Sequence, residues 1–250
     1  MSTDTNRSSR LSVEELVARS RSEMIPLTNT FAYFSTLPIA EEDLHQYLQD
    51  PIAALPPAVC TALGHIDIVL TPHLERGNGK ASAWVEFDKP PEGRQLFWAR
   101  ALTDGVTALL FAIRDVEVAD YHYYFYNAIA DVVADNWPGD SQDRFFRLLR
   151  EELSSEVHGE VDERSWHLKQ GLLRRQSNAR KETKLFRDYA RQAFKDTLTL
   201  YLHGICCDID VETGPRQMPS RYLRRRLELL ATLYPPPEGY AVFPEQIRKR

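Results

Sequence analysis

A cluster of carboxylates and histidines between residues 151 and 167 has the side chain types that hold metal ions in helical bundles. Such bundles usually supply their ligands as Glu-x-x-His pairs, and this spacing is absent from the cluster. Arg164 and Arg174 would share a helix face with its last three members and would repel a metal ion. We therefore expect solvent-facing ion pairs, and no metal or other cofactor. The weak metal candidates are Glu156, His158, Glu160, Glu163 and His167.

Two further groups carry reactive or stacking side chains. His203 lies close in sequence to Cys206 and Cys207, which places a base near a thiol, but no nucleophile signature surrounds them. The aromatic run 121–126 has rings that stack on bases in single-strand binders. Aspartates and glutamates flank this run, however, and would repel phosphates. We expect both groups to pack in the protein core.

Residues 86–89 (EFDK) contain part of the residue order of a metal-dependent nuclease strand, with Asp67 on the expected partner strand. Such sites place an acidic pair and a lysine around a divalent metal. Here Lys89 falls one residue late, at the point where the strand would end. Glycine-rich nucleotide loops, the Gly-x-Ser-x-Gly elbow and His-Glu-x-x-His are all absent. No reaction can be assigned, and the sequence favours a protein that is not an enzyme.

The most concentrated charge pattern is a stripe of five cations on an expected helix from about residue 179 to 205. At 100° per residue these cations fall within about an 80° arc, and apolar side chains point the other way. Arginine forks onto two phosphate oxygens and lysine acts as a point charge, so the stripe is suited to a phosphate backbone. It predicts nucleic-acid contacts by Arg180, Lys184, Arg187, Arg191 and Lys195, extended by Arg174, Arg175, Arg221, Arg224 and Arg225.

Two other interpretations of this stripe remain open. It is either a solvated helix face or a surface that docks on the acidic half of the same chain or of a neighbouring copy. The one nearby carboxylate, Asp188, cannot neutralise five cations. Zinc-finger spacing, an RNA-recognition aromatic pair and a basic zipper are absent, so strong sequence specificity is not expected.

Charge is divided unevenly along the chain. Residues 1–163 carry 13 Lys+Arg against 27 Asp+Glu, a net −14, and residues 164–250 carry 18 against 9, a net +9. A division of this kind predicts a basic surface for an anionic partner. The acidic half would then bind a protein partner or limit indiscriminate binding.

The composition, with 43% hydrophobic and 10% aromatic residues, predicts a folded core. Three cysteines, two of them adjacent, favour a reducing, cytoplasmic protein. The polar first ten residues predict no secretory signal. The longest apolar run, Val106 to Ile113, is shorter than the roughly 20 residues of a membrane span, so no membrane association is expected.

The elements that must position these residues are expected to be mainly helical. Ser12 and Glu15 form a capping box for a first helix. Period-two alternation predicts a β-hairpin over about 65–88, and Gln95–Ile113 is predicted as helix. The aromatic run is ambiguous between helix and strand, and the residues after it favour helix. Trp137-Pro138-Gly139-Asp140 is a strong breaker, after which helices are expected at about 141–157, 160–177, 179–205 and 220–234.

The predicted fold class is therefore mainly α, with a bundle-like C-terminal region and one small antiparallel hairpin in an N-terminal α+β part. The predicted organisation is a disordered tail (1–11), an acidic α+β region (12–137) and a basic helical region (138–250).

The predicted function is that of a non-enzymatic binding or adaptor protein whose basic helical face contacts nucleic acid without strong sequence specificity. Two alternatives are a metal-dependent enzyme built on the carboxylate and histidine cluster, and a protein-only scaffold that self-associates through its acidic and basic halves.

Overall fold

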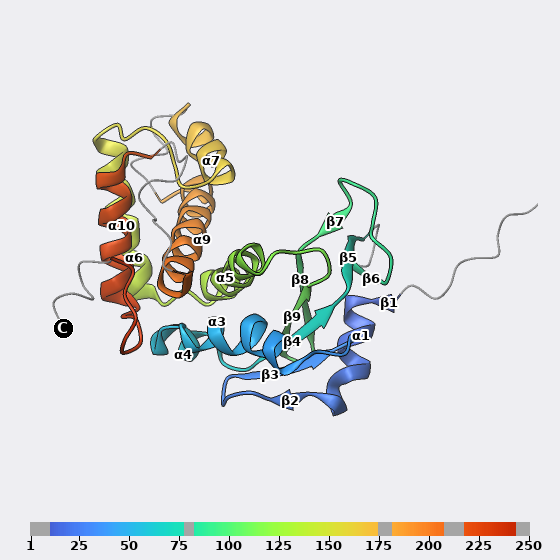
Figure 1. Ribbon diagram of the computed structural model, residues 1–250. Helices are drawn as coiled ribbons and strands as arrows, with labels where there is room; N and C mark the ends of the chain where they lie inside the picture. The colour runs from blue at the N-terminus through green and yellow to red at the C-terminus, as the bar shows by residue number, and fades with distance from the viewer. Residues whose placement is uncertain (1–10, 78–82, 175–181, 208–217, 244–250) are drawn as a thin grey trace, which may run out of the picture. The chain divides into compact units, whose positions relative to one another are not determined.

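The computed structural model describes residues 11–77, 83–174, 182–207 and 218–243 (Figure 1). It is 54% helical and 18% strand, with one sheet of four strands and one of five. The protein is an α+β fold, so the prediction of a mainly α fold with one small hairpin was wrong. The chain divides into two compact units: unit 1 contains residues 1–49 and 64–128, and unit 2 contains residues 50–63 and 129–250.

The elements follow one another in this order: β1 (Leu11–Ser12), α1 (Val13–Ser20), η1 (Arg21–Glu23), β2 (Ile25–Pro26), β3 (Phe31–Ser35), α2 (Glu41–Leu44), η2 (His45–Gln49), α3 (Asp50–Ala53), α4 (Pro57–Leu63), β4 (Ile66–Thr71), β5 (His73–Arg76), β6 (Ala83–Glu86), β7 (Gln95–Leu96), β8 (Trp98–Thr103), β9 (Val106–Ala112), α5 (Val118–Asp135), α6 (Gly139–Ser154), α7 (Glu163–Leu173), α9 (Lys184–Cys207) and α10 (Ser220–Leu233).

The larger sheet of unit 1 has the strand order β2-β3-β4-β9-β8. Strands β3, β4 and β9 are parallel, with Ile66 of β4 opposite both Phe31 of β3 and Thr107 of β9. All six residues of β4 are buried, including Asp67 and Thr71. A parallel strand that is covered on both faces has no solvent side, so the alternation of polar and apolar residues in β4 did not indicate a half-exposed hairpin strand.

The hairpin that the sequence predicted over 65–88 is made from other segments. Strand β6 pairs with β5, with Leu74 opposite Val85, and the two belong to the smaller sheet of order β1-β6-β5-β7. The predicted first strand, Ile66–Thr71, lies in the other sheet. Helix α1 begins at the predicted capping box, in which Ser12 Oγ accepts from the Glu15 amide, and this prediction was confirmed. The buried face of α1 shares one core with strands of both sheets.

Residues 95–113 form strands, so the prediction of a helix there was wrong. Strands β8 and β9 make an antiparallel hairpin in which Thr103 pairs with Val106. The two residues between them, Asp104 and Gly105, both have positive φ, at 52° and 81°. Two consecutive positive φ values are typical of the type I′ turn, whose twist suits a two-residue hairpin and which Asp-Gly favours.

The aromatic run 121–126 is helical and lies in α5. Tyr121 and Phe125 are fully buried, and their rings lie 5.5 and 5.7 Å from the ring of Phe111 on β9. Both contacts are within unit 1. The prediction that the run packs in the core was confirmed for Tyr121, Phe125 and Tyr126, whereas Tyr123 is 38% exposed and Tyr124 is half-buried.

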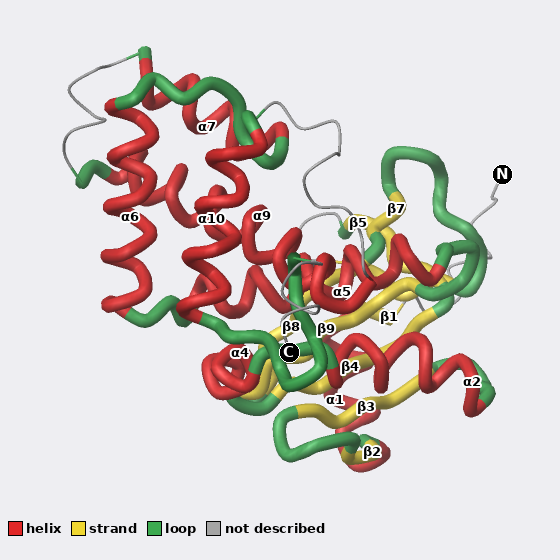
Figure 2. Tube along the Cα trace, turned by 60° about the vertical axis from the view of Figure 1, so that its left-hand side comes forward, coloured by secondary structure: helices red, strands yellow, loops and turns green. Residues whose placement is uncertain are grey.

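Helices α6, α7, α9 and α10 form most of unit 2 and stand side by side (Figures 1 and 2). Apolar side chains recur on one face of α6 and α10, which buries that face against the other helices. The ring of Trp137, just before α6, lies 3.9 Å from that of Phe194 on α9 and 5.7 Å from that of Phe145 on α6. Pro138 precedes the first residue of α6, which matches its preference for helix starts.

The two units divide the charge differently from the two halves of the sequence. The predicted boundary followed Trp137, whereas units 1 and 2 separate between Ala128 and Ile129, and residues 50–63 belong to unit 2. Unit 1 carries 10 Lys+Arg against 16 Asp+Glu, a net −6, and unit 2 carries 21 against 20, a net +1. The contrast of −14 and +9 is therefore not a contrast between folded units.

Candidate functional site

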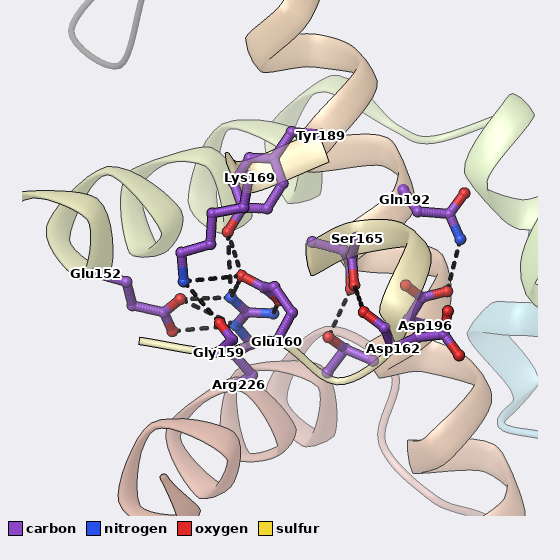
Figure 3. Close-up of polar contacts among 12 residues, drawn as sticks. Glu152, Gly159, Glu160, Asp162, Ser165, Lys169, Tyr189, Gln192, Asp196 and Arg226 are labelled. Carbon is purple, nitrogen blue, oxygen red and sulfur yellow. Dashed lines mark hydrogen bonds and ion pairs between the residues drawn. The ribbon is translucent and has the colours of Figure 1, made fainter. Parts of the chain in front are cut away.

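Unit 2 contains a network of charged side chains that is buried from solvent (Figure 3). Arg226 of α10 is its centre. Its Nε and Nη2 donate to Glu152 of α6 at 3.1 and 2.6 Å, and its Nη1 donates to Glu160 Oε2 at 2.7 Å. Arg226 is 0% exposed, Glu152 1% and Glu160 2%. This arginine therefore joins two carboxylates that a dry interior would not accept alone.

Two more side chains complete the charge balance of the network. Lys169 Nζ of α7 lies 3.1 Å from Glu160 Oε1 and donates to the Gly159 carbonyl at 2.8 Å. The Tyr189 hydroxyl of α9 donates to Glu160 Oε1 at 2.5 Å. Two cations face two carboxylates, so the buried group is electrically neutral. It ties α6, α7, α9 and α10 together.

The electrostatics of the network keep its members charged. Burial by itself raises the pKa of Glu160, but the nearby charges of Arg226 and Lys169 and the hydrogen bonds from Arg226 and Tyr189 lower it to about 2. Burial and the neighbouring Glu160 raise the pKa of Tyr189 well above its usual value. Glu160 is thus ionised and Tyr189 protonated near neutral pH, as the hydrogen bond between them requires.

This network explains the carboxylate cluster that the sequence analysis weighed as a metal site. Glu160 is bound by Arg226 and Lys169, so two cations already balance its charge. No three of the five metal candidates, all of them described residues, bring ligand atoms within 4.8 Å of one another. Glu163 and His167 form an exposed pair at 3.3 Å, as expected from their spacing. Glu156 and His158 are exposed.

The end of the predicted cationic stripe is paired with acids of the same unit. Arg191 Nη2 lies 2.6 Å from Asp135 Oδ1 and 3.3 Å from Asp131 Oδ1, both on α5. Lys195 is 7% exposed, and its Nζ lies 3.0 Å from Asp131 Oδ1. A buried ammonium that already contacts a carboxylate does not present a free charge to a phosphate. The stripe as a continuous exposed surface therefore stops before Lys195.

The rest of the stripe is exposed or lies outside the described residues. Lys184 and Arg187 are exposed at the start of α9, and Arg187 Nη1 lies 3.7 Å from Glu182 Oε1. Arg174 is exposed after α7. Arg180 and Arg175 lie outside the described residues.

Of the other predicted cations, Arg221 and Arg224 contact neighbours on α10, and Arg225 lies at a groove between α6 and α10. Arg225 lines this groove together with Arg144 and Arg147 of α6. The groove has a volume of about 210 Å³, and its lining is completed by Leu148, Leu229 and Glu151. Three arginines against one glutamate leave two positive charges. Arg225 pairs with Glu151, whereas no ion pair or hydrogen bond of the Arg144 or Arg147 side chain is found among the described residues.

The two helices that form this groove are antiparallel. Glu152 of α6 meets Arg226 of α10 at one end, and Ser141 meets Tyr234 at the other. Arg144 and Arg147 were missed by the sequence analysis because they belong to the acidic half of the chain. Their i, i+3 spacing on an amphipathic helix was the available signal, but it did not reveal that α10 would bring Arg225 beside them.

The other candidates of the sequence analysis are not assembled for catalysis. A hydrogen bond with Cys206, together with burial, raises the pKa of Cys207, so this thiol is not an activated nucleophile. Asp67 lies on β4 of the larger sheet, 3.2 Å from His65 Nε2. Glu86 ends β6 of the smaller sheet, so the strand pairing on which the nuclease interpretation depended is absent.

One buried carboxyl group of unit 2 is in an unfavourable environment. Asp196 of α9 is 7% exposed, and its Oδ1 accepts from Gln192 Nε2 at 2.7 Å. Burial is the largest cause that raises its pKa, to about 6, and Ser165 and Gln192 offset only part of the effect.

Among the described residues, no helix is long and apolar enough to cross a membrane. No protein-family model, curated protein or solved structure matches this chain.

Proposed function

We propose that this protein is a non-enzymatic nucleic-acid-binding protein, and that the arginines of the α6–α10 groove contact the phosphate backbone without strong sequence preference. A cytoplasmic location and an adaptor role belong to the same proposal. The observation that carries it is the grouping of Arg144, Arg147 and Arg225 around one groove that contains a single carboxylate. We therefore propose the α6–α10 groove as the contact surface, in place of the face of α9 that the sequence predicted.

The chemistry of these side chains favours a phosphate ligand. A guanidinium group presents parallel N–H donors that fit two phosphate oxygens, and it keeps its charge at all physiological pH values. Arg144 and Arg147 follow one another by about 4.5 Å along the helix axis, so both can contact one strand.

The buried network supports a binding role over the alternative of a metal-dependent enzyme. The two buried carboxylates of this network, Glu152 and Glu160, both form ion pairs with Arg226. The network holds α6 and α10 together directly beneath the groove, because Glu151 and Arg225 of the groove are the sequence neighbours of Glu152 and Arg226. A rigid pair of helices keeps the three arginines at fixed spacing, which lowers the entropic cost of binding.

The test measures the salt dependence of binding to a labelled, mixed-sequence oligonucleotide by fluorescence anisotropy. Three phosphate contacts on a duplex predict a slope of about −2.7 in log K against log salt, which is about a 40-fold loss between roughly 50 and 200 mM salt. The variant R144Q/R147Q/R225Q is expected to remove this slope.

The matched control is K184Q/R187Q, which removes exposed charges from the α9 stripe. It is expected to keep the wild-type slope. If the control loses as much affinity as the groove variant, the contact surface is the original stripe. If the labelled oligonucleotide does not bind the wild-type protein at low salt, the proposed function is wrong.

A further inference from the structure

The α6–α10 groove has an apolar floor as well as cationic walls. Leu148, which is 7% exposed, and the half-buried Leu229 lie between the three arginines. Phosphate groups gain nothing from apolar surface, whereas the faces of nucleobases do. The volume of about 210 Å³ is below the roughly 300–1,000 Å³ of sites for larger organic ligands, and it suits one flat group at a time.

An aromatic ring and a flat guanidinium group lie on the same side of α10. The Arg221 Cζ atom is 4.7 Å from the centroid of the Tyr222 ring, and an Arg221 Nη2 hydrogen bond to the Tyr222 hydroxyl measures 3.3 Å. Arg221, Tyr222, Arg225 and Leu229 fall within about a 100° arc of the helix. The buried face of α10, with Leu223, Leu227 and Leu230, points away from this arc. Tyr222 as a whole residue is half-buried.

The combination of arginines, an apolar surface and an aromatic ring can distinguish single strands from duplexes. A duplex presents its phosphates outside and keeps its base faces stacked inside, so it can use only the arginines. A single strand can place a base on an aromatic ring, an arginine plane or an apolar floor while its phosphates contact cations. We propose that the α6–α10 groove, together with the Arg221–Tyr222 pair, binds a segment of single-stranded nucleic acid, with the phosphates on the arginines and bases on Tyr222 and the leucine floor. This inference rests on the proposed function.

The experiment compares four probes on the full-length protein at one salt concentration. They are oligo(dT), oligo(U), a mixed-sequence duplex with the same number of phosphates as the single strands, and inorganic polyphosphate, which has charge but no bases. At least one single strand is expected to bind at least tenfold tighter than the duplex. Comparison of oligo(dT) with oligo(U) identifies DNA or RNA as the better single strand.

The variant Y222L removes the ring but keeps an apolar side chain that is compatible with a helix. It is expected to weaken single-strand binding by about fivefold to 150-fold, which is the loss of one stacked base. Duplex and polyphosphate binding should not change. The matched control is Y240L, which removes another half-buried tyrosine outside α10 and should bind like wild type. Far-ultraviolet circular dichroism and thermal unfolding verify that both variants are folded.

The outcomes separate this inference from the proposed function. If the duplex binds as tightly as the single strands and Y222L binds all probes like wild type, the single-strand inference is wrong, and loss of binding in R144Q/R147Q/R225Q still supports the proposed function. If no probe binds, both are wrong. If Y240L weakens single-strand binding as much as Y222L, the effect is a general loss of structure and the assignment of Tyr222 fails.

Discussion

Replacing Arg226 with methionine tests whether the buried network stabilises unit 2. Methionine has a similar length and no charge, so Arg226→Met leaves Glu152 and Glu160 buried without their main partner. Removing one partner of a buried ion pair lowers the free energy of unfolding by about 3–5 kcal/mol. We expect a loss of this size at pH 7, because Lys169 contacts Glu160 and leaves Glu152 buried without a cation.

The pKa of Glu160 gives this prediction a pH dependence. Its pKa of about 2 in the folded protein lies below the usual 4.5. A lowered carboxyl pKa stabilises the folded state above pH 4.5, by about 3 kcal/mol for this shift, and the contribution is lost as the pH falls towards 2. Arg226→Met removes the largest favourable cause of that shift. The difference between wild type and variant should therefore shrink as the pH falls below 4.5.

Urea unfolding followed by circular dichroism at pH 7 and at pH 3 measures both effects. Arg224→Met is the matched control, because Arg224 lies on the same helix, is partly exposed and pairs with Glu228 four residues on. We expect this exposed pair to contribute no more than about 0.5 kcal/mol. The double variant R226M/E152Q should recover part of the lost stability, because it removes one cation and one carboxylate and leaves Lys169 and Glu160 as a neutral buried pair. Equal losses in R226M and R224M, or a loss in R226M that is the same at both pH values, would refute this account of the network.

Three more substitutions test other parts of the structure. Asp196→Asn should raise the free energy of unfolding at pH 8 by up to about 3 kcal/mol and have little effect at pH 4. The folded-state pKa of about 6 lies above the usual 3.8, so this carboxyl destabilises the folded state progressively as the pH rises from 3.8 through 6. Equal effects of the substitution in urea unfolding at the two pH values would contradict this. Gly105→Ala should lower stability by about 1–2 kcal/mol in thermal unfolding because of its φ of 81°, whereas Gly139→Ala, at a helix start with open space around it, should not. Lys195→Met should lower stability by about 1.5–3 kcal/mol through loss of the Asp131 contact while oligonucleotide affinity stays unchanged, and a selective loss of affinity would restore Lys195 to the binding surface.

Features set by neighbouring residues could be predicted from the sequence. The capping box at Ser12 and the helix starts after Pro138 and at Ser220 depend on hydrogen bonds and dihedral angles within a few residues. The exposed pair of Glu163 and His167 depends only on the pitch of a helix. The hairpin at Asp104-Gly105 also had a local signal, the Asp-Gly turn. That signal was overlooked because the flanking composition favoured a helix.

Features set by distant residues could not be predicted in this way. The alternation in Ile66–Thr71 is local, but its parallel partners β3 and β9 lie far away in sequence, and they bury both faces of the strand. The same holds for the candidate site. Arg144 and Arg147 are unremarkable until α10, more than 70 residues later, places Arg225 beside them, as the 74-residue separation of Glu151 and Arg225 shows.

The sequence by itself determined which residues carry charge, and it indicated the carboxylates near residue 160 and the arginines of the C-terminal third as candidates. Only the tertiary structure decided what those charges meet. Glu152 and Glu160 are 74 and 66 residues from Arg226, yet they share its guanidinium group in a dry core. Lys195 likewise forms an ion pair with a residue that is distant in sequence, Asp131. Coulomb energy depends on distance in space and on burial, and neither follows from position along the chain.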